Sequence, residues 1–309
     1  MIRRIKNEDY LNFRGIIRRF HPESKHFEFC NGYITQAIRN HPQVYSPNKD
    51  TIVFFTKKSA GNRTPYVIVC SAGKNRLNAI KELALILYNK SKQKVIIKNV
   101  DKELAKLEKF KGFRKYKEGE SWDNISKYDD NTFPQLIIEI NKDIDLEGTP
   151  FKRLREELHL FDRRFNIELI KYKEQHKKIF AELLNKWASQ MSERMGLDKK
   201  EVIKATQMFG FLRDDFFQYL VYEKRTKRYV GFVSLSTISE LCLGYNALIN
   251  DFNYEGLYRK LMYEGVKIAA RLGFKFLNLQ GSEIKEQFDS KLKLRPDIKL
   301  ERKQLIYEQ

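Results

Sequence analysis

Hydrophobic and polar positions recur along this chain in a way that predicts mixed α/β structure. From Leu241 to Tyr245 hydrophobic residues alternate with small or polar ones, which indicates a strand with one buried face. Helical spacing follows from Leu257 to Leu272, and Gly273 suits the left-handed conformation just past a helix end. A second strand is predicted over 274–280. A strand–helix–strand unit of this length favours a parallel or mixed sheet with the helix packed across it.

The same patterns divide the remaining chain into two α/β halves joined by a helix. In the first half they predict helices over 1–20, 77–88 and 102–110, a hairpin over 51–70, and strands at 95–100 and 136–140. In the second half they predict strands at 167–172, 216–223 and 229–236 and helices at 174–195 and 199–212. We therefore expect one domain over 1–145, a linking helix over 146–166 and a second domain over 167–309.

The linking helix carries a narrow hydrophobic seam and several arginines beside it. The seam consists of Phe151, Leu154, Leu158, Phe161 and Phe165. The arginines either form a basic ridge beside a phosphate-bearing partner or a solvated flank paired with Glu156, Glu157 and Asp162. The pattern alone leaves both interpretations open. Another segment, Ser71–Arg76, stands between a strand and a helix but lacks the glycines of a phosphate loop, so we interpret it as an ordinary turn.

The net charge of +19 is the strongest feature of the composition. An excess of this size attracts polyanions, such as nucleic acid or an anionic membrane surface, although a Lys-rich proteome would also produce it. No hydrophobic run approaches the length of a membrane span, and residues 1–13 lack the apolar core of a signal peptide. We expect a cytoplasmic protein with buried, reduced cysteines at 30, 70 and 242. No spacing suggests a metal site.

Three short segments carry a resemblance to a known family. They are Asn278-Leu-Gln-Gly-Ser-Glu283, Lys291-Leu-Lys-Leu-Arg-Pro296 and Phe151-Lys-Arg-Leu-Arg155. With the predicted elements they resemble the C-terminal domain of phosphatidylglycerol lysyltransferases, which is related to the Fem-type aminoacyltransferases. The resemblance implies an α/β fold of two tandem GNAT-like acyltransferase domains, the first degenerate and the second with the active site. It also implies aminoacyl-tRNA as co-substrate and no bound cofactor.

The turn before the helix at 257 argues separately against coenzyme A. Acyl-CoA enzymes of this fold hold the diphosphate on a glycine-rich turn at a helix N-terminus. Here Asp251, Tyr254 and Glu255 occupy that turn, and only Gly256 fits the pattern. Acidic side chains at this position oppose the binding of an anion.

The resemblance also implies roles for individual residues, each of which has an ordinary structural alternative. Glu283, Lys291 and Asp251 are the expected catalytic groups. The expected acyl-substrate residues are Tyr245, Asn278, Gly281, Ser282 and Tyr258, and the expected tRNA contacts are Lys293, Arg295, Arg153 and Arg155. The acceptor of the amino acid is unidentified: a lipid headgroup, a peptide or a small metabolite would fit. Peripheral contact with an anionic membrane is a further expectation.

Two other functions compete with this one. An acyl-CoA N-acyltransferase would use the same fold with coenzyme A as donor. A non-catalytic module that binds polyanions would explain the charge without turnover, and it predicts binding that weakens with salt.

Overall fold

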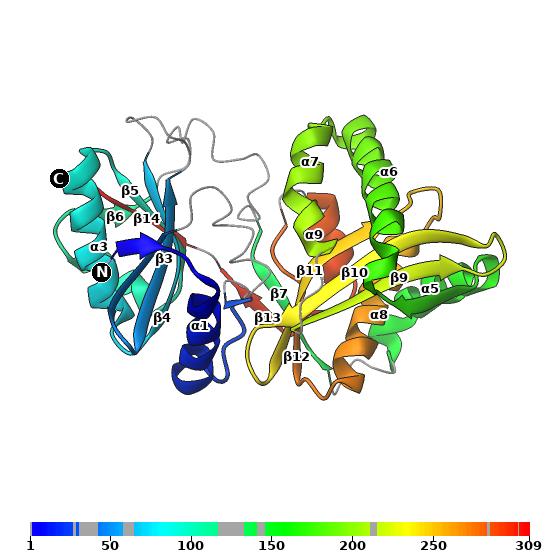
Figure 1. Cartoon of the computed structure of the whole chain (residues 1–309). Helices are drawn as coiled ribbons and strands as arrows, with labels where there is room; N and C mark the ends of the chain where they lie inside the picture. The colour runs from blue at the N-terminus through cyan, green and yellow to red at the C-terminus, as the bar shows by residue number, and fades with distance from the viewer. Residues whose placement is uncertain are drawn as a thin grey trace.

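The computed structural model describes residues 2–26, 29–30, 43–57, 65–116, 133–140, 146–210, 215–282, 285–301 and 303–309. Within these residues the strands form two mixed sheets of seven strands each (Figure 1). The two sheets lie next to each other, and helix α1 (Asn7–Phe20) packs between them. The mixed α/β class predicted from the sequence is confirmed.

The first sheet comes mainly from the N-terminal half, in the order β1-β2-β3-β4-β5-β14-β6. Its strands are β1 (Ile2–Arg4), β2 (Gln43–Asn48), β3 (Thr51–Lys57), β4 (Tyr66–Gly73), β5 (Val95–Val100), β6 (Phe113–Lys115) and β14 (Lys303–Tyr307). Helix α3 (Arg76–Ser91) covers one face and α1 the other. The predicted hairpin is the antiparallel pair of β3 and β4. The predicted helix at 102–110 is the 3-10 helix η2 (Leu104–Lys109).

The second sheet has the order β13-β7-β12-β11-β10-β9-β8. Its strands are β7 (Gln135–Glu139), β8 (Ile167–Lys171), β9 (Phe216–Glu223), β10 (Arg228–Thr237), β11 (Cys242–Asn250), β12 (Phe276–Asn278) and β13 (Ile298–Leu300). Its helices are η3 (Thr149–Phe151), α5 (Lys152–Arg164), η4 (Glu174–His176), α6 (Lys177–Met195), α7 (Lys199–Thr206), η5 (Gln207–Gly210), α8 (Leu257–Arg271) and α9 (Lys285–Leu292). Helices α5 and α8 pack on one face of this sheet, and α6 packs on the other.

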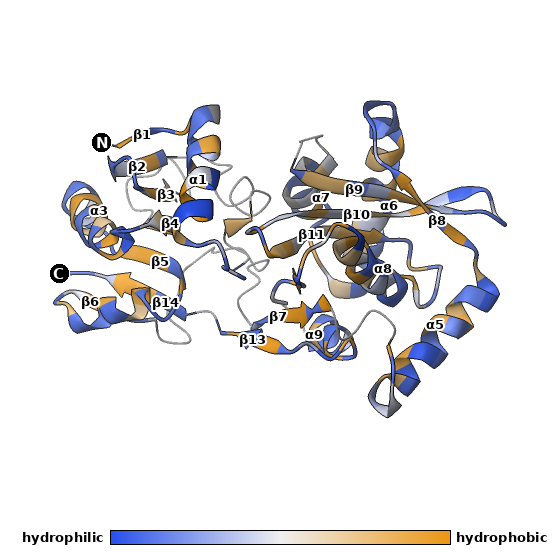
Figure 2. Ribbon diagram, turned by 90° about the horizontal axis from the view of Figure 1, so that it is seen from below, coloured by the Kyte–Doolittle hydropathy of each residue, from blue (hydrophilic) through white to orange (hydrophobic). Residues whose placement is uncertain are grey.

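The strand–helix–strand unit that dominates the sequence pattern forms as expected. Strands β11 and β12 pair in parallel, and α8 crosses between them. The seam of the linking helix is also buried, since Leu154, Leu158 and Phe161 lie in the same hydrophobic cluster as α8. Orange hydrophobic residues along α5 in Figure 2 mark this seam, and blue polar residues alternate with them.

The two sheets exchange strands across the expected domain boundary. Strand β7, which precedes residue 145, pairs with β12 and β13 in the second sheet. Strand β14, near the C-terminus, pairs with β5 and β6 in the first. The division at 145–167 predicted from the order of elements therefore does not follow the division between the sheets. Chain order alone could not reveal these two long-range pairings.

One hydrophobic cluster joins the two halves. Phe13 and Ile17 of α1 lie in it together with Ile238, Cys242 and Phe276 of the second sheet. Polar contacts add to this packing, because the Arg14 guanidinium donates to the carbonyl of Thr237 at 2.9 Å. This cluster and the Arg14 contact therefore join the two halves.

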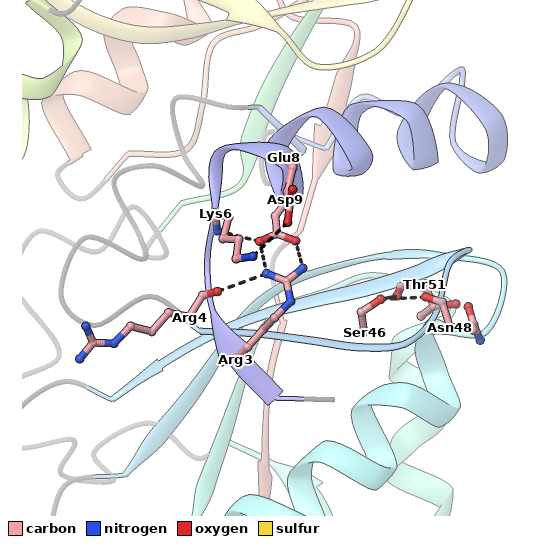
Figure 3. Close-up of polar contacts among 8 residues, drawn as sticks. All are labelled: Arg3, Arg4, Lys6, Glu8, Asp9, Ser46, Asn48 and Thr51. Atoms are coloured by element: carbon pink, nitrogen blue, oxygen red, sulfur yellow. Dashed lines mark hydrogen bonds and ion pairs between the residues drawn. The ribbon is translucent and has the colours of Figure 1, made fainter.

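The chain begins with a strand rather than with the helix predicted over 1–20. Residues Ile2–Arg4 pair with β2, and α1 begins only at Asn7. The Arg3 guanidinium donates to both carboxylate oxygens of Asp9, at 2.6 and 2.5 Å, and the Lys6 amide donates to the same carboxylate at 2.7 Å (Figure 3). The hydrophobic pattern predicted a helix from the first residue because such a pattern gives no sign of the contacts made by Asp9. This buried carboxylate fixes the turn between β1 and α1.

Candidate active site

The candidate site lies where β11 and β12 separate. Their parallel pairing ends at Gly244 opposite Asn278. Beyond this pair the chain follows β7 instead, and the Leu136 amide donates to the carbonyl of Gln280 at 3.3 Å. The side-chain amide of Gln280 reaches across the gap and donates to the carbonyl of Tyr245. A separation between central strands is a usual place for a ligand in an α/β sheet.

Lys291 of α9 lies at this separation. Its side chain is buried, and its ammonium group donates to the carbonyl of Gly281 at 2.5 Å. The neighbouring Ser282 is fully buried, and its hydroxyl has no hydrogen-bond partner within the described residues. Burying an ammonium group costs folding free energy unless hydrogen-bond acceptors surround it. Its position beside the turn after β12 therefore favours a functional role for Lys291. The structure thus brings together three of the predicted site residues.

Tyr245 and Asn278 have structural contacts that account for them fully. The Tyr245 hydroxyl donates to the carbonyl of Leu261 in α8 at 2.6 Å, and burial raises the pKa of this phenol well above its usual value. The Asn278 amide donates to the carbonyl of Lys25 at 2.6 Å and to the side chain of Gln135 at 2.7 Å. These two residues hold α8 and a segment of the first half against the second sheet. Their predicted role in lining the acyl slot stays a prediction.

Asp251 stands at the far end of β11 from the Gly281 turn. Asp251 lies six positions after Tyr245, which corresponds to about 20 Å at the rise of an extended strand. Its carboxylate accepts from the Lys186 ammonium at 2.5 Å and from the Gln190 amide at 2.9 Å. Burial works to raise the pKa of Asp251, but these two hydrogen bonds outweigh it and the pKa is lowered. A carboxylate held in this way is a poor base near neutral pH, and its distance from Lys291 argues against the catalytic role expected for it.

In the turn after β11, three backbone amides already donate hydrogen bonds within the protein. The amide of Asn253 donates to the Asp251 carboxylate at 3.1 Å, and that of Phe252 donates to the Gln190 side chain at 3.2 Å. The amide of Tyr254 donates to the Asp251 carbonyl at 3.1 Å. Three amides of the turn between β11 and α8 are therefore already bonded within the protein.

Two of the four predicted tRNA contacts, Arg153 and Lys293, lie around one carboxylate. Glu157 of α5 lies 3.4 Å from the guanidinium of Arg153 and 3.3 Å from the ammonium of Lys293, and it also pairs with Arg259. Partial burial works to raise the pKa of Glu157, but Arg259 and Lys293 lower it. Three cations around one acid leave a positive excess.

The pairing of Arg153 with Glu157 agrees with the interpretation as a paired flank, while its side chain is 81% exposed, so a basic ridge beside a partner stays a prediction. Arg155 donates to the carbonyl of Gly148 at 2.8 Å, and Arg295 donates to that of Pro150 at 2.9 Å. These two arginines serve mainly to fix the start of the linking helix.

Two further predicted residues do not add to the site geometry. Glu283 lies outside the described residues. Tyr258 is half-buried and packs against the hydrophobic cluster under α8. No group of three metal-ligating side chains occurs in the part of the chain that the structure describes. In that same part no helix has both the length and the apolar character needed to cross a bilayer.

A buried polar network at the same sheet was missed by the sequence analysis. Asn246 is an extra residue in β11, because Ser234 pairs with Ala247 and the next residue of β10 pairs with Tyr245. Its side-chain oxygen accepts from the Ser236 hydroxyl at 2.9 Å and from the Cys30 thiol at 2.8 Å. The sequence did contain a sign of this network, because Ser234 and Ser236 are polar residues at alternate positions of the otherwise hydrophobic strand β10.

Gln280 was missed as well. Its backbone has a φ of 65°, a left-handed conformation that is uncommon for a residue with a side chain. Such backbone strain is often found at functional sites. The conformation turns the chain out of β12 and aims the side chain across the separation.

Comparisons with known proteins define the class. Both halves have the GNAT-like fold in tandem, as in FemX, whose structure matches with 14% identity over 100% of this chain and 97% of that one, at a TM-score of 0.60. L-PGS from Bacillus licheniformis matches with 13% identity over 98% of this chain and 92% of that one, at a TM-score of 0.65. A conserved protein of unknown function from Bacteroides thetaiotaomicron matches with 16% identity over 99% of both chains, at 0.78.

The family follows from a match to the model described as phosphatidylglycerol lysyltransferase, C-terminal, over residues 130–295. This match covers more than half of the chain, and the protein belongs to that family. The resemblance inferred from the three sequence segments is confirmed. No curated protein sequence matches the chain. Family and fold together support a transferase of the acyltransferase type.

Proposed function

We propose that this protein transfers an amino acid from aminoacyl-tRNA to an amine or hydroxyl acceptor. One observation carries the choice of donor: in the turn after β11 the amides of Phe252, Asn253 and Tyr254 are already bonded, and the Asp251 carboxylate adds negative charge there. That arrangement opposes coenzyme A, whose diphosphate would need free amides at this helix N-terminus. Membership in the lysyltransferase family supports a charged tRNA as the alternative donor.

In the proposed reaction the acceptor nitrogen or oxygen attacks the carbonyl carbon of the aminoacyl ester. A bond forms between the acceptor and that carbon, the bond to the ribose oxygen breaks, and the acceptor's proton passes to the released ribose hydroxyl. Negative charge develops on the carbonyl oxygen during the attack. The terminal phosphate of the tRNA carries its own negative charge nearby. A buried ammonium in a site of low dielectric stabilises such charge more strongly than it would in water.

Lys291 is the residue proposed for this role. Its ammonium lies against the turn after β12 and is held by the carbonyl of Gly281, so it is already positioned and largely desolvated. Glu283 stays a prediction for binding the donor's amino group or for proton transfer. The acceptor stays open among a lipid headgroup, a peptide and a small metabolite.

The test is to incubate the protein with a pool of charged tRNAs and to measure which ester disappears faster than by spontaneous hydrolysis. Candidate acceptors are added in parallel. The variant Lys291→Met keeps the length of the side chain without its charge, and we expect it to lose about 100-fold or more in rate. Lys285→Met in the same helix is the control, because Lys285 is exposed and, among the residues that the structure describes, pairs only with Asp289, at 2.6 Å. Micromolar binding of coenzyme A, with no effect on any aminoacyl ester, would reject the proposal.

A further inference from the structure

A compact basic surface lies at the end of the second domain where α5 meets the turn between β9 and β10. We call it the basic tip. It consists of Arg163, Arg164, Lys224, Arg225, Lys227 and Arg228, all of them exposed. In Figures 1 and 2 the β9–β10 turn projects beyond the sheet, and one end of α5 lies close to it. Arg163 and Arg164 belong to the linking-helix arginines for which the sequence left a basic ridge open, whereas the four cations of the β9–β10 turn were not among the expected tRNA contacts.

The basic tip is held in one shape by contacts beneath it. The Arg225 guanidinium donates to the carbonyls of Arg163 and Arg164, at 3.0 and 2.8 Å, and so fixes the turn to the end of α5. The Thr226 hydroxyl lies 3.1 Å from that of Tyr254. Buried Glu223 accepts from the Thr226 amide at 2.6 Å. A cluster of like charges is thus kept close together, although dispersing them would lower their mutual repulsion.

Neighbouring acids neutralise only part of this charge. Glu168 pairs with Lys224 at 3.0 Å, and Glu255 pairs with Arg164 at 3.1 Å. Within the described residues the side chains of Arg163, Lys227 and Arg228 form no ion pair. The dipole of α5 favours cations at its C-terminal end, which explains Arg163 and Arg164. The dipole does not explain Lys227, which lies in the β9–β10 turn, or Arg228, which begins β10.

The surface leads toward the candidate active site. Glu255 and Tyr254, which touch the basic tip, belong to the turn at the end of β11. From Asn250 that strand runs back to Tyr245, where β11 and β12 separate, over about 17 Å at the rise of an extended chain. Tyr222 and Tyr229, next to the tip, are half-exposed with ring centroids 5.2 Å apart. Such rings are suited to stacking on bases beside a phosphate-binding surface.

We propose that the basic tip binds the phosphate backbone of the donor tRNA, with the 3′ end extending along β11 toward Lys291. This inference rests on the proposed function. Four of the six cations are arginines (163, 164, 225 and 228), whose planar fork matches phosphate oxygens. A membrane surface fits less well. None of the large hydrophobic side chains that the described residues expose belongs to the tip, the nearest in sequence being Leu160.

The test uses the triple variant Arg163→Gln/Lys227→Gln/Arg228→Gln, because these exposed side chains hold no ion pair with any described residue and we expect the variant to keep the fold. Binding of uncharged tRNA is measured by fluorescence anisotropy between 50 and 200 mM salt. We expect at least a tenfold loss of affinity and a decrease of about 2 in the slope of log affinity against log salt. The control is Lys102→Gln/Lys106→Gln/Lys109→Gln around η2, which removes the same charge from exposed positions of the other domain.

The outcomes separate this inference from the proposed function. If the tip variant and the control bind tRNA equally well, the surface is wrongly assigned, whether or not the wild type consumes charged tRNA. If the tip variant loses binding to phosphatidylglycerol vesicles but keeps its affinity for tRNA, the partner is a membrane and the inference fails. If tRNA binding depends on the tip while no aminoacyl ester is consumed, the surface stands and the proposed function fails.

Discussion

Removing the Glu223 carboxylate is expected to destabilise the protein and to abolish one acid-dependent part of its stability. Glu223 is fully buried at the end of β9. Its carboxylate accepts from the amides of Asn166 and Thr226, at 2.9 and 2.6 Å, and from the Thr226 hydroxyl at 2.7 Å. The amide of Arg225 donates to it as well, at 3.2 Å. The side chain of Gln offers one acceptor oxygen and would turn its own N–H groups toward these donors.

The size of the effect follows from the pKa. Burial works to raise the pKa of Glu223, but the hydrogen bonds from Thr226, Asn166 and Arg225 lower it from 4.5 to about 2. A difference of about 2.5 units corresponds to roughly 3 kcal/mol at most. The turn borders solvent, so we expect about 2 kcal/mol for Glu223→Gln at pH 7. Because the folded pKa is the lower one, this stability is present above about pH 4.5 and is lost as the pH falls toward 2.

Urea denaturation followed by circular dichroism at pH 7, 5, 4 and 3 measures this contribution. The difference in unfolding free energy between wild type and Glu223→Gln should be largest at pH 7 and should shrink steadily below pH 4.5. Glu168→Gln is the control, since that side chain is half-exposed and, in the described part of the chain, forms a surface ion pair with Lys224 alone. A constant difference at every pH would refute the reasoning, because the variant's cost would then have nothing to do with ionisation.

Three further outcomes are expected. Gly265→Ala should lower the unfolding free energy measured in urea by about 2–3 kcal/mol, because the added Cβ would lie 2.0 Å from the Tyr245 hydroxyl oxygen. Combining it with Tyr245→Phe should relieve part of this loss. Gly15→Ala is the control and should not destabilise the protein, because nothing lies within 4 Å of its Cβ. Asp9→Asn should lower the unfolding free energy by about 1–3 kcal/mol, since it weakens the hydrogen bonds to Arg3 and Lys6, and unchanged stability would contradict that role. The buried cysteines at 30, 70 and 242 should react with a thiol reagent only after denaturation, and rapid labelling of the native protein would contradict their burial.

The sequence predicted the second domain best where a single period extended over many residues. Strands β8, β9 and β10 and helices α6 and α8 lie within a few residues of the expected positions, because each buries one hydrophobic face. The long-range pairings of β7 and β14 were missed, since short strands of three to five residues carry no mark of their partner. The sequence also placed the first helix too early, because a period cannot register a buried ion pair such as Arg3–Asp9.

The candidate site was only partly predictable for a similar reason. Gly281, Ser282 and Lys291 come together because they are close in sequence and share one turn and one helix. Asp251 was chosen for its residue type and its place after a strand, but Lys186 from α6 neutralises it. That partner stands 65 residues earlier, and nothing in the local pattern connects the two.

The separation of β11 and β12 depends on residues from both halves of the chain, although the family match spans only 130–295. The end of β12 is fixed by the Asn278 amide on the carbonyl of Lys25, and the extra residue in β11 is fixed by the thiol of Cys30. Without the first half, Phe276 and other members of the shared hydrophobic cluster would be exposed to water. A fragment limited to residues 130–295 would also leave β7 without its partner β13, which lies beyond residue 295. The first domain is therefore part of the site's architecture, because its residues contact both strands that separate there.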